Sequence, residues 1–240
     1  MTTPPQLVIG VPGAWANRSD IVGAIVGRSG GYIFAGAVML KIGTKDAFKL
    51  EIYDRDPNLR RAFAAAGYGR FTEADLAPLD SHTFTLYLVT EGGSIESARK
   101  AMHAAQGLLN AGGLAVKIES SGVAHLSTSW KSFCDDDDLH ALFRAYVTFV
   151  GDDGDWYTCG LHNLGLPDVS VEDDVTAQEA GRLLQAFAGY LLFEEPTLND
   201  GETFSVDAEA PLYRLQHVHC TRFEDDLFHN PYGLWKLTPV

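Results

Sequence analysis

Residues 94–118 read SIESARKAMHAAQGLLNAGGLAVKI, and this stretch decides the fold class of the chain. Its first part predicts a long helix, because Ser94 is a good N-cap and the apolar residues after it recur at three- and four-residue spacing. A Gly-Gly pair ends the helix, and residues 114–118 are a short apolar run typical of a strand. Residues 82–89, which precede the helix, are rich in Thr, Phe, Tyr and Val, as strands are. Strand, helix and strand in this order form a βαβ or split-βαβ unit.

The C-terminal half resembles this plan. Residues 145–150 and 156–161 flank the turn Gly-Asp-Asp-Gly-Asp and predict a hairpin. Thr176 and Glu179 have the spacing of a capping box, so we expect a second long helix from there to Phe193. The sequence therefore predicts an α+β protein with mixed or antiparallel sheets, helices packed on one face, and two pseudo-repeated ferredoxin-like halves.

Two segments bear on how the halves are joined and built. Residues 32–42 form one apolar run and predict a single central strand. No low-complexity segment separates the halves, and residues 127–138 are the nearest candidate for a linker. We expect an α+β half at residues 1–131 and another at 132–240, either as two domains or as one continuous domain with a shared core.

Charge is divided unevenly between the halves. Residues 1–131 carry 13 Lys+Arg and 11 Asp+Glu, a net charge of +2, whereas residues 132–240 carry 5 and 21, a net charge of −16. Clustered carboxylates repel phosphate groups, so the composition argues against nucleic acid and against an anionic membrane as partners. A basic protein partner fits such an acidic surface.

Compartment and solubility follow from simpler features. Hydrophobic residues make up 46% of the 240-residue chain, which is typical of a globular protein. The opening Met-Thr-Thr-Pro-Pro has neither the basic nor the apolar region of a secretory signal, and the cysteine count of three is odd. Together these features favour the cytoplasm.

The loop after the predicted hairpin is the first candidate site. Residues 157–168 read YTCGLHNLGLPD, which places His162, Asn163 and Asp168 on one irregular segment. Polar residues on loops held by rigid elements often form binding or catalytic sites. The alternative is a structural turn, in which Asn and Asp bond to the nearby backbone while Gly and Pro set its angles.

A metal site is the second candidate. His217 and His219 point to the same face of a strand and can ligate one divalent ion if His162 or Asp168 supplies a third ligand. The alternative is a solvated strand face. No motif indicates any other cofactor, so none is expected beyond such a metal.

An acidic turn is the third candidate. Asp152, Asp153 and Asp155 lie close together in the acidic half, without the twelve-residue pattern of a calcium loop. We expect these carboxylates to take part in binding a basic partner. The alternative is a solvated acidic face with no partner.

Four stretches together resemble a bacterial family of unknown function. They are residues 111–125, 162–168, 200–203 and 230–235, and the most specific pieces are GLPD, ending at Asp168, and NPYGLW. The resemblance implies a cytoplasmic α+β protein. It carries over no catalytic residue, because the family has no established ones.

Two functions of different classes remain open. The first is a non-enzymatic binding protein, for example an immunity-like one, which uses its acidic surface against a basic partner. The second is an enzyme or metal-dependent binder with a site around His162, Asp168, His217 and His219. Convergence of those four side chains would favour the second function.

Overall fold

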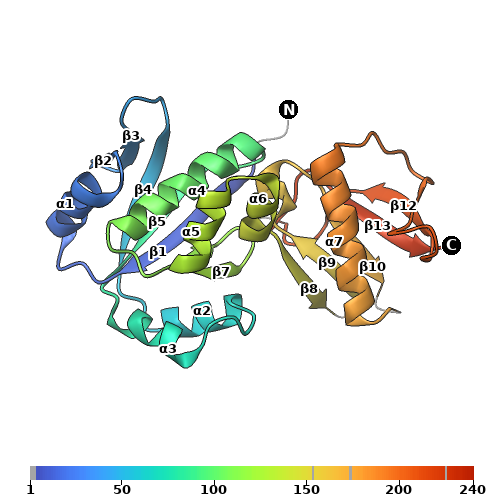
Figure 1. The fold of residues 1–240 in the computed structure, drawn as a ribbon, viewed down its shortest axis with the longest axis horizontal. Coiled ribbons are helices and arrows are strands. Elements are labelled where there is room, and N and C mark those ends of the chain that lie inside the picture. The colour runs from blue at the N-terminus through green and yellow to red at the C-terminus, as the bar shows by residue number, and fades with distance from the viewer. Residues whose placement is uncertain (1–3, 153, 173–174, 225) are drawn as a thin grey trace.

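The computed structural model describes residues 4–152, 154–172, 175–224 and 226–240, and it confirms an α+β fold built on two sheets (Figure 1). The first sheet is antiparallel, and its strands in spatial order are β2 (Tyr32–Ala35), β3 (Val38–Lys41), β4 (Ala47–Asp54), β5 (Phe84–Glu91), β1 (Gln6–Gly13), β6 (Ala115–Ile118) and β7 (Val123–Leu126). The second sheet has the order β11 (Thr203–Phe204), β12 (Tyr213–Val218), β13 (Leu234–Pro239), β10 (Asp168–Glu172), β9 (Asp155–Cys159) and β8 (Thr148–Asp152). It is mixed, because β10 and β13 run parallel.

Seven α-helices and two short 3₁₀ helices lie within the described residues. They are α1 (Arg18–Arg28), α2 (Leu59–Ala66), α3 (Glu73–Leu76), η1 (Ala77–Ser81), α4 (Ile95–Asn110), α5 (Ser127–Asp136), α6 (Leu139–Tyr146), η2 (Leu161–Leu164) and α7 (Ala177–Glu194). Both long helices begin as predicted. The Ser94 hydroxyl accepts a hydrogen bond from the Ser97 amide, and Thr176 and Glu179 form a capping box.

Two local predictions are wrong. Residues 32–42 form a hairpin rather than one strand, because Gly36 takes a left-handed φ of 64° and turns the chain between β2 and β3. Residues 127–138 are not a linker, because α5 occupies most of them and buries Trp130 and Phe133.

The main hydrophobic core is continuous across both sheets. It reaches from Leu7 on β1 to Leu237 on β13 and includes the buried face of α7. The helices between the sheets are tied to α4 by two hydrogen bonds: Trp130 Nε1 donates to the Met102 carbonyl over 3.1 Å, and the Tyr146 hydroxyl donates to the Ala98 carbonyl over 2.7 Å. Neither the division into two domains nor the ferredoxin-like repeat is tested by these contacts, and both stay predictions.

A smaller core lies where α2 and α3 meet the β6–β7 end of the first sheet. Phe63 and Leu76 pack there with Ala115 and Ala124, which point away from the main core because strand side chains alternate between faces.

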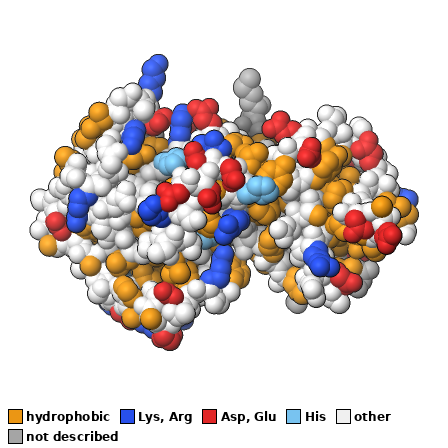
Figure 2. Space-filling model, viewed as in Figure 1, with side chains coloured by type: hydrophobic (Ala, Val, Ile, Leu, Met, Phe, Trp, Pro, Cys, Tyr) orange, Lys and Arg blue, Asp and Glu red, His pale blue; other side chains and the backbone are white. Residues whose placement is uncertain are grey.

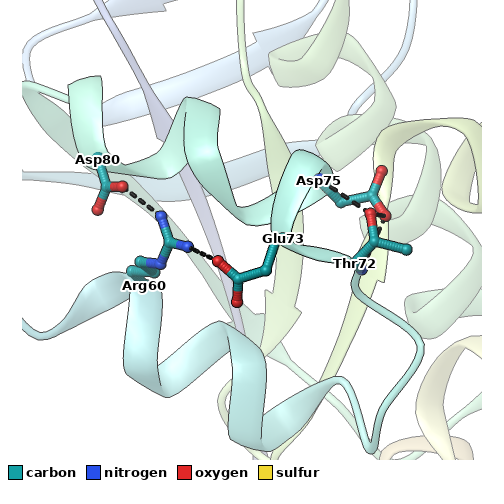
Figure 3. A network of polar contacts seen from close by, with 5 residues as sticks. All are labelled: Arg60, Thr72, Glu73, Asp75 and Asp80. Carbon is teal, nitrogen blue, oxygen red and sulfur yellow. Dashed lines mark hydrogen bonds and ion pairs between the residues drawn. The ribbon is translucent and has the colours of Figure 1, made fainter.

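Ion pairs and a cap brace the α2–α3 segment (Figure 3). The Arg60 guanidinium on α2 pairs with both Glu73 on α3 and Asp80 in η1. Thr72 and Asp75 form a capping box that starts α3. The connection between the two helices, residues 67–71, is therefore held at both ends.

Within the described ranges, no helix combines the length and the apolar character that a membrane crossing requires.

Candidate functional site

The loop at residues 160–167 connects β9 to β10, and its first part, residues 160–164, lies inside the molecule rather than on its surface. His162, Asn163 and Asp168 are all buried. Gly160 allows this placement, because its φ of 115° is left-handed and a Cβ there would lie 2.1 Å from the Tyr146 carbonyl oxygen. The loop is thereby pressed against the end of α6.

Asp168 is the centre of a buried hydrogen-bond network. Its Oδ1 accepts from the Thr158 hydroxyl over 2.9 Å and from the Leu161 amide over 3.3 Å, and its Oδ2 accepts from Asn230 Nδ2 over 2.7 Å. Burial raises the pKa of Asp168 to about 7, although the hydrogen bonds from Asn230 and Thr158 pull it downward. The network fixes β9, β10 and the C-terminal loop relative to one another.

Asn163 joins this loop to the first sheet. Its Oδ1 accepts from the Ser120 hydroxyl over 2.8 Å, its Nδ2 donates to the Gly160 carbonyl, and its own carbonyl accepts from the Gly93 amide. Ser120 lies in the β6–β7 turn and Gly93 lies before α4. Asn163 therefore helps to dock the two sheets.

The His162 ring is buried without a hydrogen bond to any described residue. The backbone of Leu227 and Ser120 lies near the ring, but neither ring nitrogen makes a contact with hydrogen-bond geometry within the described part of the chain. Burial lowers the pKa of His162 to about 4, so the ring is neutral at neutral pH.

Access to the Asp168 network is narrow. Beside the carboxyl lies a cavity of about 10 Å³, which Cys159 and Cys220 also line. Such a space holds about one water molecule and excludes a larger ligand. The geometry therefore fits the structural-turn reading of this loop, and a direct role of His162, Asn163 or Asp168 in binding stays a prediction.

His217 lies on β12, whereas His219 follows the end of that strand, so the prediction that both point to one face of a strand is wrong. Both histidines are exposed and contact different neighbours. His217 Nε2 lies 3.0 Å from the Tyr232 carbonyl, and its ring lies 4.9 Å from the Trp235 ring. The His219 ring instead faces His229, at 6.2 Å. Among the described residues, no three His, Cys, Asp or Glu side chains are grouped so that they could hold a metal ion. The metal site at His217 and His219 stays a prediction.

Of the predicted acidic cluster, Asp155 is half-buried and forms an ion pair with Arg222. Asp152 lies at the end of β8, and Asp153 lies outside the described residues.

A groove of about 900 Å³ runs beside His217, and we name it the acidic groove. Its walls come from the start of α4, the end of η2, the end of α7 with its following loop, β12 and the C-terminal segment. The floor is apolar, and its polar groups are Glu195, Asn199, Asp200, His217 and Tyr232. None of the described residues that line it is Lys or Arg.

His217 is held rigidly in this groove. Asp200 Oδ1 accepts from the His217 amide over 2.8 Å. Because the Tyr232 carbonyl can only accept, the contact with His217 Nε2 assigns the ring proton to that nitrogen. Gly233 has a φ of 96° and approaches the ring so closely that a Cβ would lie 2.7 Å from Nε2. The imidazole is therefore wedged between backbone and Trp235.

Sequence reasoning identified His217 but missed the carboxylates and the aromatic floor around it. Asp200 lies in the stretch DGET, and Tyr232 and Trp235 lie in NPYGLW. The family resemblance rested on both stretches, so it was the feature of the sequence that could have pointed to these residues. Glu195 had no signal in the sequence; it ends α7 with a left-handed φ of 47°.

Comparison with known proteins places the groove in a family segment. Residues 157–237 match the family described as Domain of unknown function (DUF4261). The match runs from β9 to β13 and includes three of the four stretches on which the resemblance rested; residues 111–125 lie outside it. Every groove-lining residue except Ile95 belongs to the matched segment. No curated protein and no solved structure matches the chain.

Proposed function

We propose that the protein is a binding protein whose acidic groove receives a basic segment of a partner protein. The observation that carries this proposal is the lining of the groove. It combines an apolar floor with the carboxylates of Glu195 and Asp200, and the described residues that line it include neither Lys nor Arg. A segment with an apolar side chain next to Lys or Arg is complementary to both features.

The carboxylates of the groove are available to a ligand. Asp200 uses one oxygen to accept from the His217 amide, and Glu195 makes no ion pair with any residue that the structure describes. Both side chains are exposed, so each pair with a cationic partner is worth only about 0–1 kcal/mol. Affinity must therefore come mainly from the apolar floor, with the charges setting orientation.

Net charge supports fast association with such a partner. The half that contains the groove carries a net charge of −16, and a field of that sign attracts a basic protein over a Debye length of about 8 Å at physiological salt. Figure 2 shows acidic side chains beside hydrophobic ones along the upper margin between the two halves.

Rigidity of the groove also favours binding. His217 is fixed by Asp200, Tyr232 and Trp235, so little conformational entropy is lost there when a partner docks.

The test is a selection of random peptides displayed on phage against the full chain, with counter-selection against the double variant E195Q/D200N. We expect the enriched peptides to place Lys or Arg next to Leu, Ile or an aromatic residue. A synthetic copy should bind with an affinity that falls about tenfold in the double variant, since two charge pairs are lost.

Glu194 offers a matched control, because it is exposed, adjacent to Glu195 and outside the groove lining. E194Q should bind the synthetic peptide as the natural chain does. The proposal fails if no peptide is enriched, if acidic peptides dominate, or if E194Q weakens binding as much as the groove variants.

A further inference from the structure

A second hollow of about 600 Å³ lies between the edge strands β7 and β8, and we name it the cationic hollow. Its lining comes from the α2–α3 connection, β7, the first part of α5, the end of α6, β8 and Gln185 on α7. Figure 2 shows the surface indented between the two halves at the lower margin, with basic side chains beside the indentation.

Its charge is opposite to that of the chain. Arg70 and Arg144 line it, and no Asp or Glu is found among the described residues that do so. Arg70 Nε donates to the Gly67 carbonyl over 2.9 Å, and the Arg144 guanidinium lies 5.0 Å from the centre of the Phe133 ring. Neither guanidinium forms an ion pair with a residue that the structure describes.

Arg70 and Arg144 come from different halves of the sequence, and both line the hollow together with His125. Burial lowers the pKa of His125 to about 4; the hydrogen bond to the Ala145 carbonyl opposes this effect, and the nearby charges of Arg70 and Arg144 add to it.

The start of α5 adds hydrogen-bond donors. Leu126 and Ser129 line the hollow, and Leu126 is the N-cap of this ten-residue helix. Among the described residues, no side chain caps the helix, so its first amides keep their affinity for an anion.

The remaining walls are aromatic. Phe71, Phe133, Phe143 and Phe149 contribute rings, and Tyr68 is 53% exposed at the entrance. A volume of about 600 Å³ is within the usual range for small-molecule sites, which are mostly apolar with a few placed polar groups.

The connection that carries Tyr68, Arg70 and Phe71 is held in place. Gly67 ends α2 and Thr72 caps α3, and the Arg60 ion pairs shown in Figure 3 lock the two helices together. The guanidinium of Arg70 is thus presented on a braced segment rather than on a free loop.

We propose that the cationic hollow is a binding site for a small organic anion in which a phosphate or carboxylate group is joined to an aromatic ring. Arg70, Arg144 and the start of α5 hold the anionic group, because guanidinium forks and free helix amides both match its oxygens. The aromatic walls hold the ring.

The test is isothermal titration of the full chain with four probes. Adenosine 5′-monophosphate carries a phosphate on a ring system, phenylacetate carries a carboxylate, and adenosine and inorganic phosphate each lack one part. We expect at least one aromatic anion to bind with a Kd below about 1 mM, and at least tenfold more tightly than adenosine or inorganic phosphate. R70Q and R144Q should each weaken that binding about tenfold.

Arg182 supplies the matched control, because it is exposed on α7, close to Gln185, and does not line the hollow. R182Q should bind as the natural chain does. The Arg144 side chain is exposed on α6 and makes no hydrogen bond with described residues, so R144Q stays informative even if R70Q loosens its loop. The proposal is overturned if neither aromatic anion binds, or if R144Q and R182Q bind the tighter probe equally well.

Discussion

The acidic groove and the cationic hollow both lie at the junction of the two sheets, yet they have opposite chemistry. The groove combines Glu195 and Asp200 with an apolar floor. The hollow combines Arg70 and Arg144 with aromatic walls and an uncapped helix start. Among the described lining residues, the acidic groove contains no Lys or Arg and the cationic hollow contains no Asp or Glu. A chain with a net charge of −14 thus presents two surfaces of different selectivity.

The difference teaches that charge counted along the sequence does not give charge at a site. Arg144 comes from the half with a net charge of −16, and Arg70 comes from the nearly neutral half. Folding places both in the lining of one hollow, together with His125, and no Asp or Glu from the acidic half is among the described residues of that lining. The steering field and the binding pocket are therefore separate properties, and variants can address them separately.

Removing the shared support of the two sites should have the largest effect. Helix α7 contributes Leu191 and Leu192 to the groove and Gln185 to the hollow, and Leu184, which precedes Gln185 on the same helix, is 1% exposed in the core. Leu184→Ala should lower the free energy of unfolding by about 2–5 kcal/mol, because it leaves a cavity. Urea denaturation measures this loss. Arg182→Gln on the exposed face should change it by less than about 0.5 kcal/mol. Equal midpoints for the two variants would contradict the assigned packing.

The carboxyl behind the groove should give a pH-dependent effect. Between pH 4 and 7 the folded chain keeps a proton on Asp168 that the unfolded chain has released, so this group lowers stability as the pH rises. In Asp168→Asn the new side-chain amide faces the Asn230 amide, so two hydrogen-bond donors oppose each other. We expect the free energy of unfolding of the variant to be about 1–3 kcal/mol lower than that of the natural chain at pH 5. This difference should shift by about 3 kcal/mol in favour of the variant at pH 7.5, where the natural chain has a buried charge. Urea unfolding at both pH values tests this, and a cost independent of pH would show that Asp168 has an ordinary pKa.

Two buried histidines allow a direct comparison: His125 lines the cationic hollow, and His162 lies in η2, whose last residue lines the acidic groove. Below pH 6.5 the unfolded chain takes up a proton on His125 and on His162, which the folded chain does not accept until about pH 4. Each histidine therefore lowers stability by about 2 kcal/mol between pH 7.5 and 5. Replacing either one by Phe should remove its share of this loss.

At pH 7.5 the two replacements should differ. His125 Nε2 donates to the Ala145 carbonyl over 3.0 Å, whereas His162 makes no side-chain hydrogen bond with any residue that the structure describes. His125→Phe should therefore cost about 1–3 kcal/mol, and His162→Phe should be close to neutral or stabilising. Similar losses in thermal unfolding at this pH would mean that His162 has a partner after all.

Much of the fold could be predicted because its signals are local. Ser94 and Thr176 each predict a helix through a capping pattern that spans three residues, and the acidic turn at residues 151–155 predicts the β8–β9 hairpin. Residues 127–138 were the nearest candidate for a linker, yet α5 occupies most of them. Its burial depends on Trp130 and Phe133, whose partners are distant in sequence.

The site was less predictable for the same reason. Asp168 is held by Asn230, 62 residues away, and Asn163 is held by Ser120, 43 residues away. A loop with Gly, Pro, Asn and Asp normally lies at the surface. Here it lies between two sheets, and only the distant partners make its burial tolerable. The acidic groove and the cationic hollow are each lined by several segments that are distant in sequence, so no single motif predicts either of them.

Backbone strain at the edge of the acidic groove should give the smallest effect on stability. Glu195 adopts a left-handed conformation, with φ of 47° and ψ of 49°, at the C-cap of α7, where glycine is usual. Such a conformation costs about 1–2 kcal/mol for a residue with a side chain, and glycine recovers part of it at the expense of a more flexible unfolded chain. Glu195→Gly should therefore raise the free energy of unfolding by about 0.5–1 kcal/mol while weakening basic peptides as E195Q does. The neighbour provides the contrast: Glu194 is helical, so Glu194→Gly should lose about 1 kcal/mol and leave peptide affinity unchanged. Opposite signs of stability at adjacent positions, with binding lost only in the stabilised variant, would indicate that a strained glutamate is kept for its contact with the partner. Loss of stability in both variants would remove that explanation and leave Glu195 as an ordinary helix end.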